Sequence, residues 1–139
     1  MFPILLCTAL LAPLNVNKYD LRLATCTRVA TTAQSEGLDP ALMVSIGWVE
    51  SAMLPKVNSG KGAVGPLQVI PKYFCPKGKL KGCDTVRAGM DAFKAWRKHF
   101  PKLEDTLCHY NGGWKCKAPS KWYARKVLRI RARLSVAMR

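Results

Sequence analysis

The fold is decided by the stretch Trp48–Ile70, which reads WVESAMLPKVNSGKGAVGPLQVI. Its first residues end an apolar helix that we expect to begin at Asp39-Pro40, because aspartate is a favoured N-cap and proline fits the first helical position. Apolar residues recur at helical spacing from Leu42 to Met53, so one face of this helix is predicted to be buried.

Glu50 is the acidic residue near the end of this predicted helix, between apolar neighbours. A carboxyl group in such surroundings is partly desolvated, which raises its pKa and keeps it able to donate a proton near neutral pH. The following loop, Asn58–Gln68, contains small residues that let the backbone pass close to a helix or a ligand. Ser59 and Gln68 are therefore candidates to share the space around Glu50. Without further information, a capped helix with a solvated glutamate and a glycine-rich turn is the simpler interpretation.

The charge of the chain is strongly positive. Its 139 residues suffice for one domain with a hydrophobic core. Lys and Arg number 23 against 8 Asp and Glu, a formal net charge of +15. Such a charge favours polyanionic partners, which include nucleic acid, anionic lipid surfaces and bacterial envelope polymers. Charge alone does not choose among them, and the sequence contains no internal repeat and no glycine-rich phosphate loop.

The six cysteines favour disulfides over a metal site. Cys75/Cys83 and Cys108/Cys116 are two pairs with seven residues between partners, and Cys7 and Cys26 remain. Zinc ligands usually lie closer, with about two to four residues between them, so we expect no metal. Short-range disulfides in an oxidising compartment are the better interpretation, and Cys7 then pairs with Cys26. The sequence does not prove this connectivity, because six cysteines permit many arrangements.

The N-terminal segment is apolar and uncharged from Phe2 to Val16. It is too short to span a bilayer as an ordinary helix. It resembles the apolar part of a secretory signal, but it lacks a basic start, and two prolines interrupt it. We therefore expect residues 1–17 to form a hydrophobic arm or signal-like segment and residues 18–139 to form the main domain. Packing of the arm on the core, on a partner or on a membrane stays open.

The rest of the chain shows helical periodicity, so the fold class is predicted to be mainly α, a single helical domain. Further helices are expected over Lys18–Glu36, from Asp84 or Thr85 to about Phe100, over Leu103–Tyr110, and from Ser120, as a cap, to about Met138. In the second of these, an aromatic and apolar stripe that includes Trp96 is interpreted as core and not as a ligand platform.

Three motifs follow one another in a characteristic order. Glu50-Ser51 is followed by Ser59 and then by Gly65-Pro66-Leu67-Gln68; Tyr110-Asn111-Gly112-Gly113 comes later, and Tyr123–Val127 reads Tyr-x-x-x-Val. In this order, the motifs resemble the catalytic domain of the soluble lytic transglycosylases (SLT), a goose-type-lysozyme-like family. The resemblance covers about Ala24 to Leu134. Pro66 and Leu67 stand where the family has Leu-Met, so a reshaped sugar subsite is expected.

The resemblance implies a mainly α, lysozyme-like α+β fold with at most a small β element after the catalytic helix. It also implies non-hydrolytic cleavage of the bond between N-acetylmuramic acid (MurNAc) and N-acetylglucosamine (GlcNAc), without a cofactor. By the family pattern, Glu50 is catalytic, and Ser59 and Gln68 contact the sugar. Tyr110 would form a hydrogen bond near Glu50 and position it, and Asn111 would fix the backbone around Tyr110.

The acidic residues are few. Glycoside hydrolases usually add a second carboxylate to the acid, but no acidic residue besides Glu50 stands in the loop after the motif. One carboxylate suffices if the C6 hydroxyl of MurNAc attacks C1 and forms a 1,6-anhydro product. Two alternatives stay open: a lysozyme-type hydrolase in which Asp84 or Asp91 assists water, and a non-catalytic cationic protein that binds envelope polymer or nucleic acid.

The expected partners are peptidoglycan glycan strands and anionic envelope polymers, with no specific nucleic acid. Other virion or secretion-apparatus proteins are further candidates. The expected location is the periplasm, the cell envelope or a phage virion. Compactness and basicity favour a phage-encoded protein that opens a local hole in the cell wall.

Overall fold

The computed structural model describes residues 2–139; Met1, which belongs to the predicted 1–17 arm, lies outside the described residues. The helices are α1 (Phe2–Leu11), η1 (Ala12–Leu14), α2 (Tyr19–Ser35), α3 (Pro40–Ser51), α4 (Pro71–Phe74), η2 (Pro76–Gly78), α5 (Thr85–His99), α6 (Leu103–Gly112) and α7 (Ala118–Ala137). Two isolated antiparallel bridges, Asn58 with Val64 and Val64 with Val69, lie in the loop after α3. The prediction of a mainly α domain with a small β element is confirmed.

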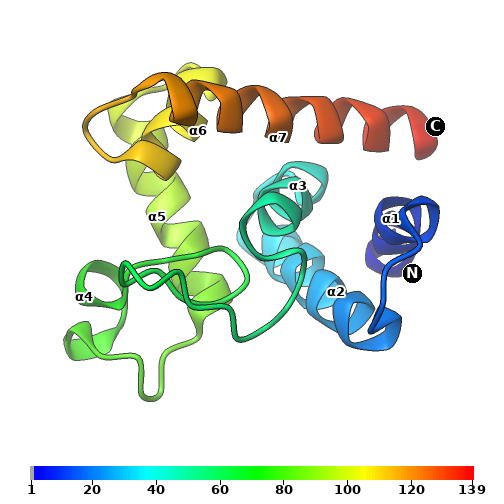
Figure 1. Cartoon of the computed structure of the whole chain (residues 1–139), viewed down its shortest axis with the longest axis horizontal. Coiled ribbons are helices and arrows are strands. Elements are labelled where there is room, and N and C mark those ends of the chain that lie inside the picture. The colour runs from blue at the N-terminus through cyan, green and yellow to red at the C-terminus, as the bar shows by residue number, and fades with distance from the viewer. Residues whose placement is uncertain (1) are drawn as a thin grey trace.

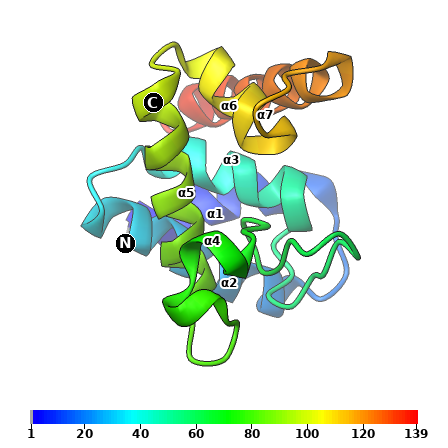
Figure 2. The same ribbon diagram turned by 90° about the vertical axis from the view of Figure 1, so that its left-hand side faces the viewer.

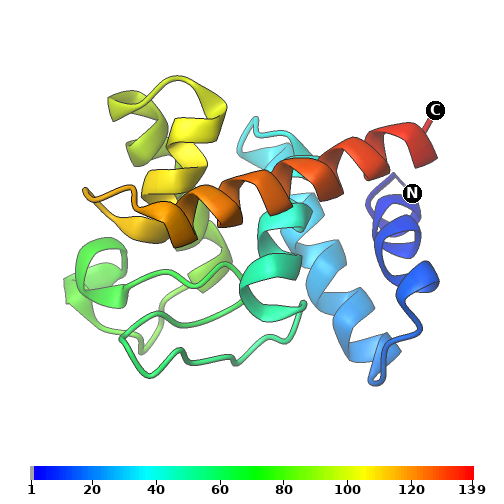
Figure 3. The same cartoon turned by 45° about the horizontal axis from the view of Figure 1, so that its top comes forward.

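Helix α3 lies at the centre of the molecule. Figure 1 shows α7 lying across the other helices, with α1 and α2 toward one end and α5 with α6 toward the other. Figure 2 brings α5 to the front, with α4 near one end of it. In Figure 3, the loop between α3 and α4 runs below α7 as an extended segment. This loop carries two of the predicted site residues, Ser59 and Gln68.

The start of α3 follows from its sequence. Asp39 is the N-cap, and its carboxylate accepts a hydrogen bond of 3.0 Å from the backbone N–H of Ala41. Pro40 occupies the first helical position, as predicted. Residues 42–47 are all buried, so the first two turns of α3 are embedded in the core.

The end of α3 is a sharp turn. The Ser51 hydroxyl donates to the carbonyl of Gly47 at 3.0 Å and accepts from the backbone N–H of Met53 at 3.2 Å. Ala52 and Met53 then adopt left-handed backbone angles, with φ of 51° and 63°. Because the chain turns away at once, Glu50 remains on the last turn of the helix, at the edge of the core.

Two glycines let the loop after α3 pack tightly. A Cβ on Gly47 would lie 2.8 Å from Met53 Cε, and a Cβ on Gly89 of α5 would lie 2.6 Å from Leu67 Cβ. Met53 and Leu67 are fully buried. The loop is thus held against α3 at its beginning and against α5 near its end.

Helix α1 is packed into the core. Its residues Leu6, Cys7, Leu10 and Leu11 are fully buried. A disulfide joins Cys7 to Cys26 of α2, with a Cα–Cα distance of 5.8 Å. Within residues 2–139, none of the helices combines the length and the apolar character needed to cross a membrane.

Two further disulfides close short segments. Cys75 is bonded to Cys83, with a Cα–Cα distance of 5.4 Å, and Cys108 to Cys116, with 5.5 Å. The three pairs that the structure links are the three that the sequence suggested. The disulfide content expected for an oxidising compartment is therefore present in the fold.

The prediction that Ser120 caps the last helix is wrong. Helix α7 begins at Ala118, with Lys117 as its N-cap residue and Pro119 in its first turn, where proline is tolerated. Ser120 is buried, and its hydroxyl donates to Asn111 Oδ1 at 2.9 Å. The serine therefore joins α7 to α6 and does not cap α7.

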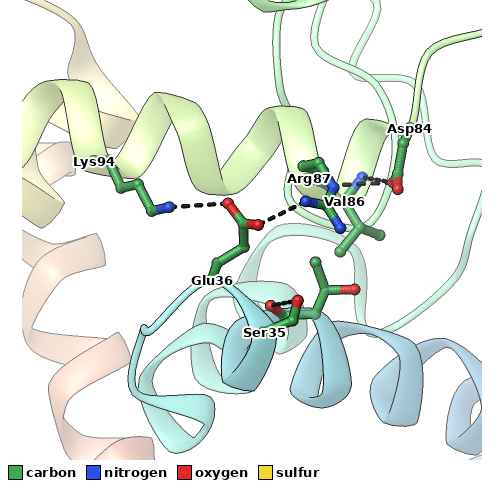
Figure 4. Close-up of polar contacts among 7 residues, drawn as sticks. Ser35, Glu36, Asp84, Val86, Arg87 and Lys94 are labelled. Carbon is green, nitrogen blue, oxygen red and sulfur yellow. Dashed lines mark hydrogen bonds and ion pairs between the residues drawn. The ribbon is translucent and has the colours of Figure 1, made fainter.

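Ion pairs on the surface tie α2 to α5, as Figure 4 shows. Glu36, at the end of α2, accepts from Arg87 Nη1 at 2.6 Å and from Lys94 Nζ at 2.9 Å, and these contacts, led by the bond from Lys94, lower the pKa of its carboxyl. Asp84 caps α5 by accepting from two backbone N–H groups. It also pairs with Arg28 at 2.8 Å. The Asp84 carboxylate is thus used for the helix cap and for the ion pair with Arg28.

Candidate active site

A cleft of about 770 Å³ opens beside the end of α3. Its walls come from α3, the loop after it, α4, α5 and α6, and they include all five predicted site residues: Glu50, Ser59, Gln68, Tyr110 and Asn111. Within residues 2–139, Glu50 is the one carboxylate in its lining. The structure therefore brings the predicted residues together around a single acid.

The environment of Glu50 favours its protonated form. Burial is the main cause, and it raises the pKa of the carboxyl from 4.5 to about 7. The nearby Tyr123 hydroxyl acts in the opposite direction and lowers this pKa. A carboxyl with a pKa near 7 is present both as acid and as base at neutral pH, which suits general acid–base catalysis.

Tyr110 lines the cleft, but its hydroxyl group forms a hydrogen bond to the loop between α3 and α4. It donates to the backbone carbonyl of Leu67 at 2.6 Å. Burial, and next the charge of Glu50, raise the pKa of Tyr110 well above its usual value. The phenol therefore stays protonated, and its single proton holds the loop against α6 near Glu50.

Tyr123 of α7 is a further candidate site residue, beyond the five predicted from the sequence. It is 8% exposed, and its hydroxyl makes no hydrogen bond of ordinary length and angle within residues 2–139. It nevertheless lies close enough to the Glu50 carboxyl to lower the pKa of that group, and Glu50 in turn helps raise the pKa of Tyr123. The signal was present in the sequence, because Tyr123 begins the Tyr-x-x-x-Val motif.

Ser59 and Gln68 shape the loop and also line the cleft. The Ser59 hydroxyl oxygen accepts from the backbone N–H groups of Lys61 at 3.0 Å and Ala63 at 3.2 Å. The Gln68 amide nitrogen donates to the carbonyls of Val57 and Gly65, both at 2.9 Å. Both side chains therefore fix the backbone of the wall that they expose to the cleft.

An aromatic wall forms one end of the cleft. It consists of Trp96, His99 and Trp114, with the Trp96 and Trp114 rings edge to face at 4.8 Å. The interpretation of Trp96 as core is wrong: it is half-buried and lines the cleft, while Phe93, one turn earlier, is fully buried. Helical spacing identified the face correctly, but this part of α5 packs against rings from α6 and the α6–α7 loop.

The sequence was compared with known protein families. Residues 28–129 match the Transglycosylase SLT domain. The chain belongs to the transglycosylase SLT family. Neither the curated proteins nor the solved structures that were compared with it gave a match. Membership implies a glycan-cleaving transglycosylase with peptidoglycan as its substrate, and proteins of this family act on peptidoglycan outside the cytoplasm.

In this SLT domain, none of the other carboxylates within residues 2–139 lines the cleft. Asp84 caps α5 and pairs with Arg28, and neither Asp84 nor Asp91 lines the cleft. Within the described part of the chain, no group of three His, Cys, Asp or Glu side chains is arranged to hold a metal ion. Glu50 is the carboxyl that the described residues place in the cleft lining, and the side chains of Tyr110 and Tyr123 lie near it.

Replacing Tyr123 by phenylalanine is expected to raise the pKa of Glu50 above about 7, because the hydroxyl that lowers this pKa is removed. The alkaline limb of the pH profile for glycan cleavage should move to higher pH, since Glu50 then keeps its proton longer. The measurement is kcat/KM on purified peptidoglycan as a function of pH. Tyr19→Phe, at the start of α2, serves as control. An unchanged alkaline limb in Tyr123→Phe would show that this hydroxyl does not tune the acid.

Proposed function

We propose that this SLT domain cleaves the β-1,4 bond between MurNAc and GlcNAc without water, with Glu50 as both acid and base. The observation that carries the proposal is that Glu50 is the single carboxylate in the cleft lining formed by residues 2–139, with a pKa of about 7. A hydrolase of the common two-carboxylate type needs a partner that these walls do not supply.

The proposed reaction has two proton transfers. Glu50 first donates its proton to the oxygen at C4 of GlcNAc, and the bond between this oxygen and C1 of MurNAc breaks. The Glu50 carboxylate then removes the proton of the C6 hydroxyl on the same MurNAc, and the C6 oxygen forms a bond to C1. The products are a GlcNAc end with a free C4 hydroxyl and a 1,6-anhydro-MurNAc end. Glu50 regains its proton, so no water is consumed.

The neighbouring residues have proposed roles that follow from their free hydrogen-bonding capacity. The Ser59 oxygen already accepts two backbone N–H groups, so its own proton remains to be donated to the sugar. Both amide protons of Gln68 are directed to the loop, so its carbonyl oxygen remains to accept from an N-acetyl N–H. Tyr110 positions the loop through Leu67, and Asn111 holds α6 to α7 through Ser120.

Product analysis tests the proposal directly. Purified peptidoglycan digested with the protein should yield muropeptides that end in 1,6-anhydro-MurNAc, as identified by mass spectrometry. Digestion in water enriched in heavy oxygen should leave these ends unlabelled. Reducing-end MurNAc that carries the heavy oxygen would instead show a lysozyme-type hydrolase, and the non-hydrolytic mechanism would be wrong.

The proposed setting is local opening of the cell wall by a phage particle or, as the second choice, during assembly of a secretion apparatus. The net charge of +15 suits an envelope that bears phosphates and carboxylates. The three disulfides suit an oxidising location. Detection of the protein in purified virions by mass spectrometry is the expected result for the phage setting, and absence from them would exclude it.

A further inference from the structure

A second hollow lies beside the cleft, and we call it the side groove. It has a volume of about 330 Å³ and lies between α3, α6 and α7, with Val49, Asn111, Trp122, Lys126 and Arg129 among its lining residues. Asn111 also lines the main cleft, and Tyr123, whose hydroxyl lies near the Glu50 carboxyl, lines the side groove. The side groove therefore adjoins the cleft next to the catalytic carboxyl.

The side groove combines an apolar wall with positive charge. Trp122, Lys126 and Arg129 are spaced by four and three residues on α7, so they lie on one face of that helix. Trp122 is 67% exposed, and both cations are exposed. Over residues 2–139, neither Lys126 nor Arg129 makes an ion pair, whereas other arginines of α7 pair with Glu104 or Asp39.

The proposed substrate has a branch that must leave the cleft near Glu50. The stem peptide of peptidoglycan is attached through the lactyl group at C3 of MurNAc, the sugar whose C1 reacts. The branch point is therefore within one sugar ring of the cleaved bond. A linear glycan fills a single cleft, but a branched one needs a second path that begins beside the acid.

We propose that the side groove binds the stem peptide of the reacting MurNAc, with peptide carboxylates on Lys126 and Arg129 and the chain lying along Trp122. The inference rests on the proposed function, because it places MurNAc beside Glu50. Unpaired cations next to an exposed aromatic ring suit an acidic peptide better than an uncharged sugar. The side groove thus makes the domain selective for wall polymer that still carries its peptides.

The test compares two substrates that differ only in the peptide. One is purified peptidoglycan glycan with its stem peptides, and the other is the same glycan after an amidase has hydrolysed the lactyl–peptide amide, which leaves a single lactyl carboxylate in place of each peptide. In the double variant Lys126→Glu/Arg129→Glu, kcat/KM for peptide-bearing glycan should fall about tenfold, through KM, while the value for peptide-free glycan stays unchanged. Lys121→Glu, on the same helix but outside the side groove, is the matched control for charge reversal. Unchanged cleavage of peptide-free glycan also shows that the variant is folded.

A binding measurement separates this inference from the reaction mechanism. Calorimetry with Glu50→Gln should show tighter binding of a GlcNAc–MurNAc–tetrapeptide than of the peptide-free disaccharide, and the double variant in this background should abolish the difference. Equal losses on both glycans would mean that the side groove binds sugar, and no loss on either would mean that it binds nothing relevant. Either result would overturn the inference. A hydrolytic product would overturn the proposed function but leave the peptide preference intact.

Discussion

Glu50→Gln is expected to reduce the rate of glycan cleavage by about a thousandfold. Glutamine keeps the size and polarity of the side chain but has no carboxyl proton to donate. Within residues 2–139, the walls of the cleft hold no other carboxylate that could replace it. Because the same group is proposed to act as acid and then as base, its loss removes both proton transfers at once.

Release of soluble muropeptides from purified peptidoglycan measures this effect. Glu104→Gln is the matched control: Glu104 is acidic, lies on α6 outside the cleft lining, and is 45% exposed at its side chain. It should retain nearly full activity. Cell lysis by Glu50→Gln without release of muropeptides would show that the positive charge of the chain disrupts cells by itself. Release of muropeptides by Glu50→Gln as fast as by the parent protein would show that cleavage does not need this carboxyl. The catalytic role of Glu50 would then be wrong.

The same substitution is expected to stabilise the protein at alkaline pH. In the folded state, the pKa of the Glu50 carboxyl is about 7, against 4.5 for an unperturbed carboxyl. Between these values, the folded protein binds a proton that the unfolded chain has lost, so the free energy of unfolding falls as pH rises from about 4.5 to about 7. A difference of this size corresponds to about 3 kcal/mol. Glu50→Gln cannot titrate, so its free energy of unfolding does not show this decrease.

Chemical denaturation of both proteins at several pH values provides the measurement. The difference in unfolding free energy between Glu50→Gln and the parent should grow in favour of the variant from pH 4 to pH 8. The other titrating groups, such as Glu36, are shared by both proteins, so they largely cancel in this difference. A difference that is independent of pH would mean that the pKa of Glu50 is not raised by burial.

Much of the fold could be predicted from the sequence because the signals are local. The Asp39-Pro40 start of α3, the cap at Asp84 and the apolar spacing within the helices depend on neighbouring residues alone. The start of α7 was misplaced because serine is also a good cap. The Ser120 hydroxyl instead donates a hydrogen bond to Asn111, on another helix. No local sequence pattern reveals such a contact.

The site was predictable in part for a similar reason. Glu50, Ser59 and Gln68 lie within one continuous stretch, and Tyr110 and Asn111 lie in a recognisable motif. Tyr123 and Trp114 reach the site from a distant helix and loop, so their positions depend on how α6 and α7 pack. The side groove also depends on helix packing. The spacing of Lys126 and Arg129 is visible in the sequence, but the hollow that they border is formed by three helices.

The two short disulfide-closed segments differ in whether their residues line the cleft, and this difference matters for engineering the protein. The ring closed by Cys108 and Cys116 includes Tyr110, Asn111 and Trp114, all of which line the cleft. The ring closed by Cys75 and Cys83 contributes no residue between its cysteines to that lining. Its exposed tip, with Lys79 and Leu80, is therefore the natural point at which to insert an affinity tag or a targeting peptide. A graft there leaves the walls of the cleft intact, whereas the same graft in the other ring would separate residues that must remain together.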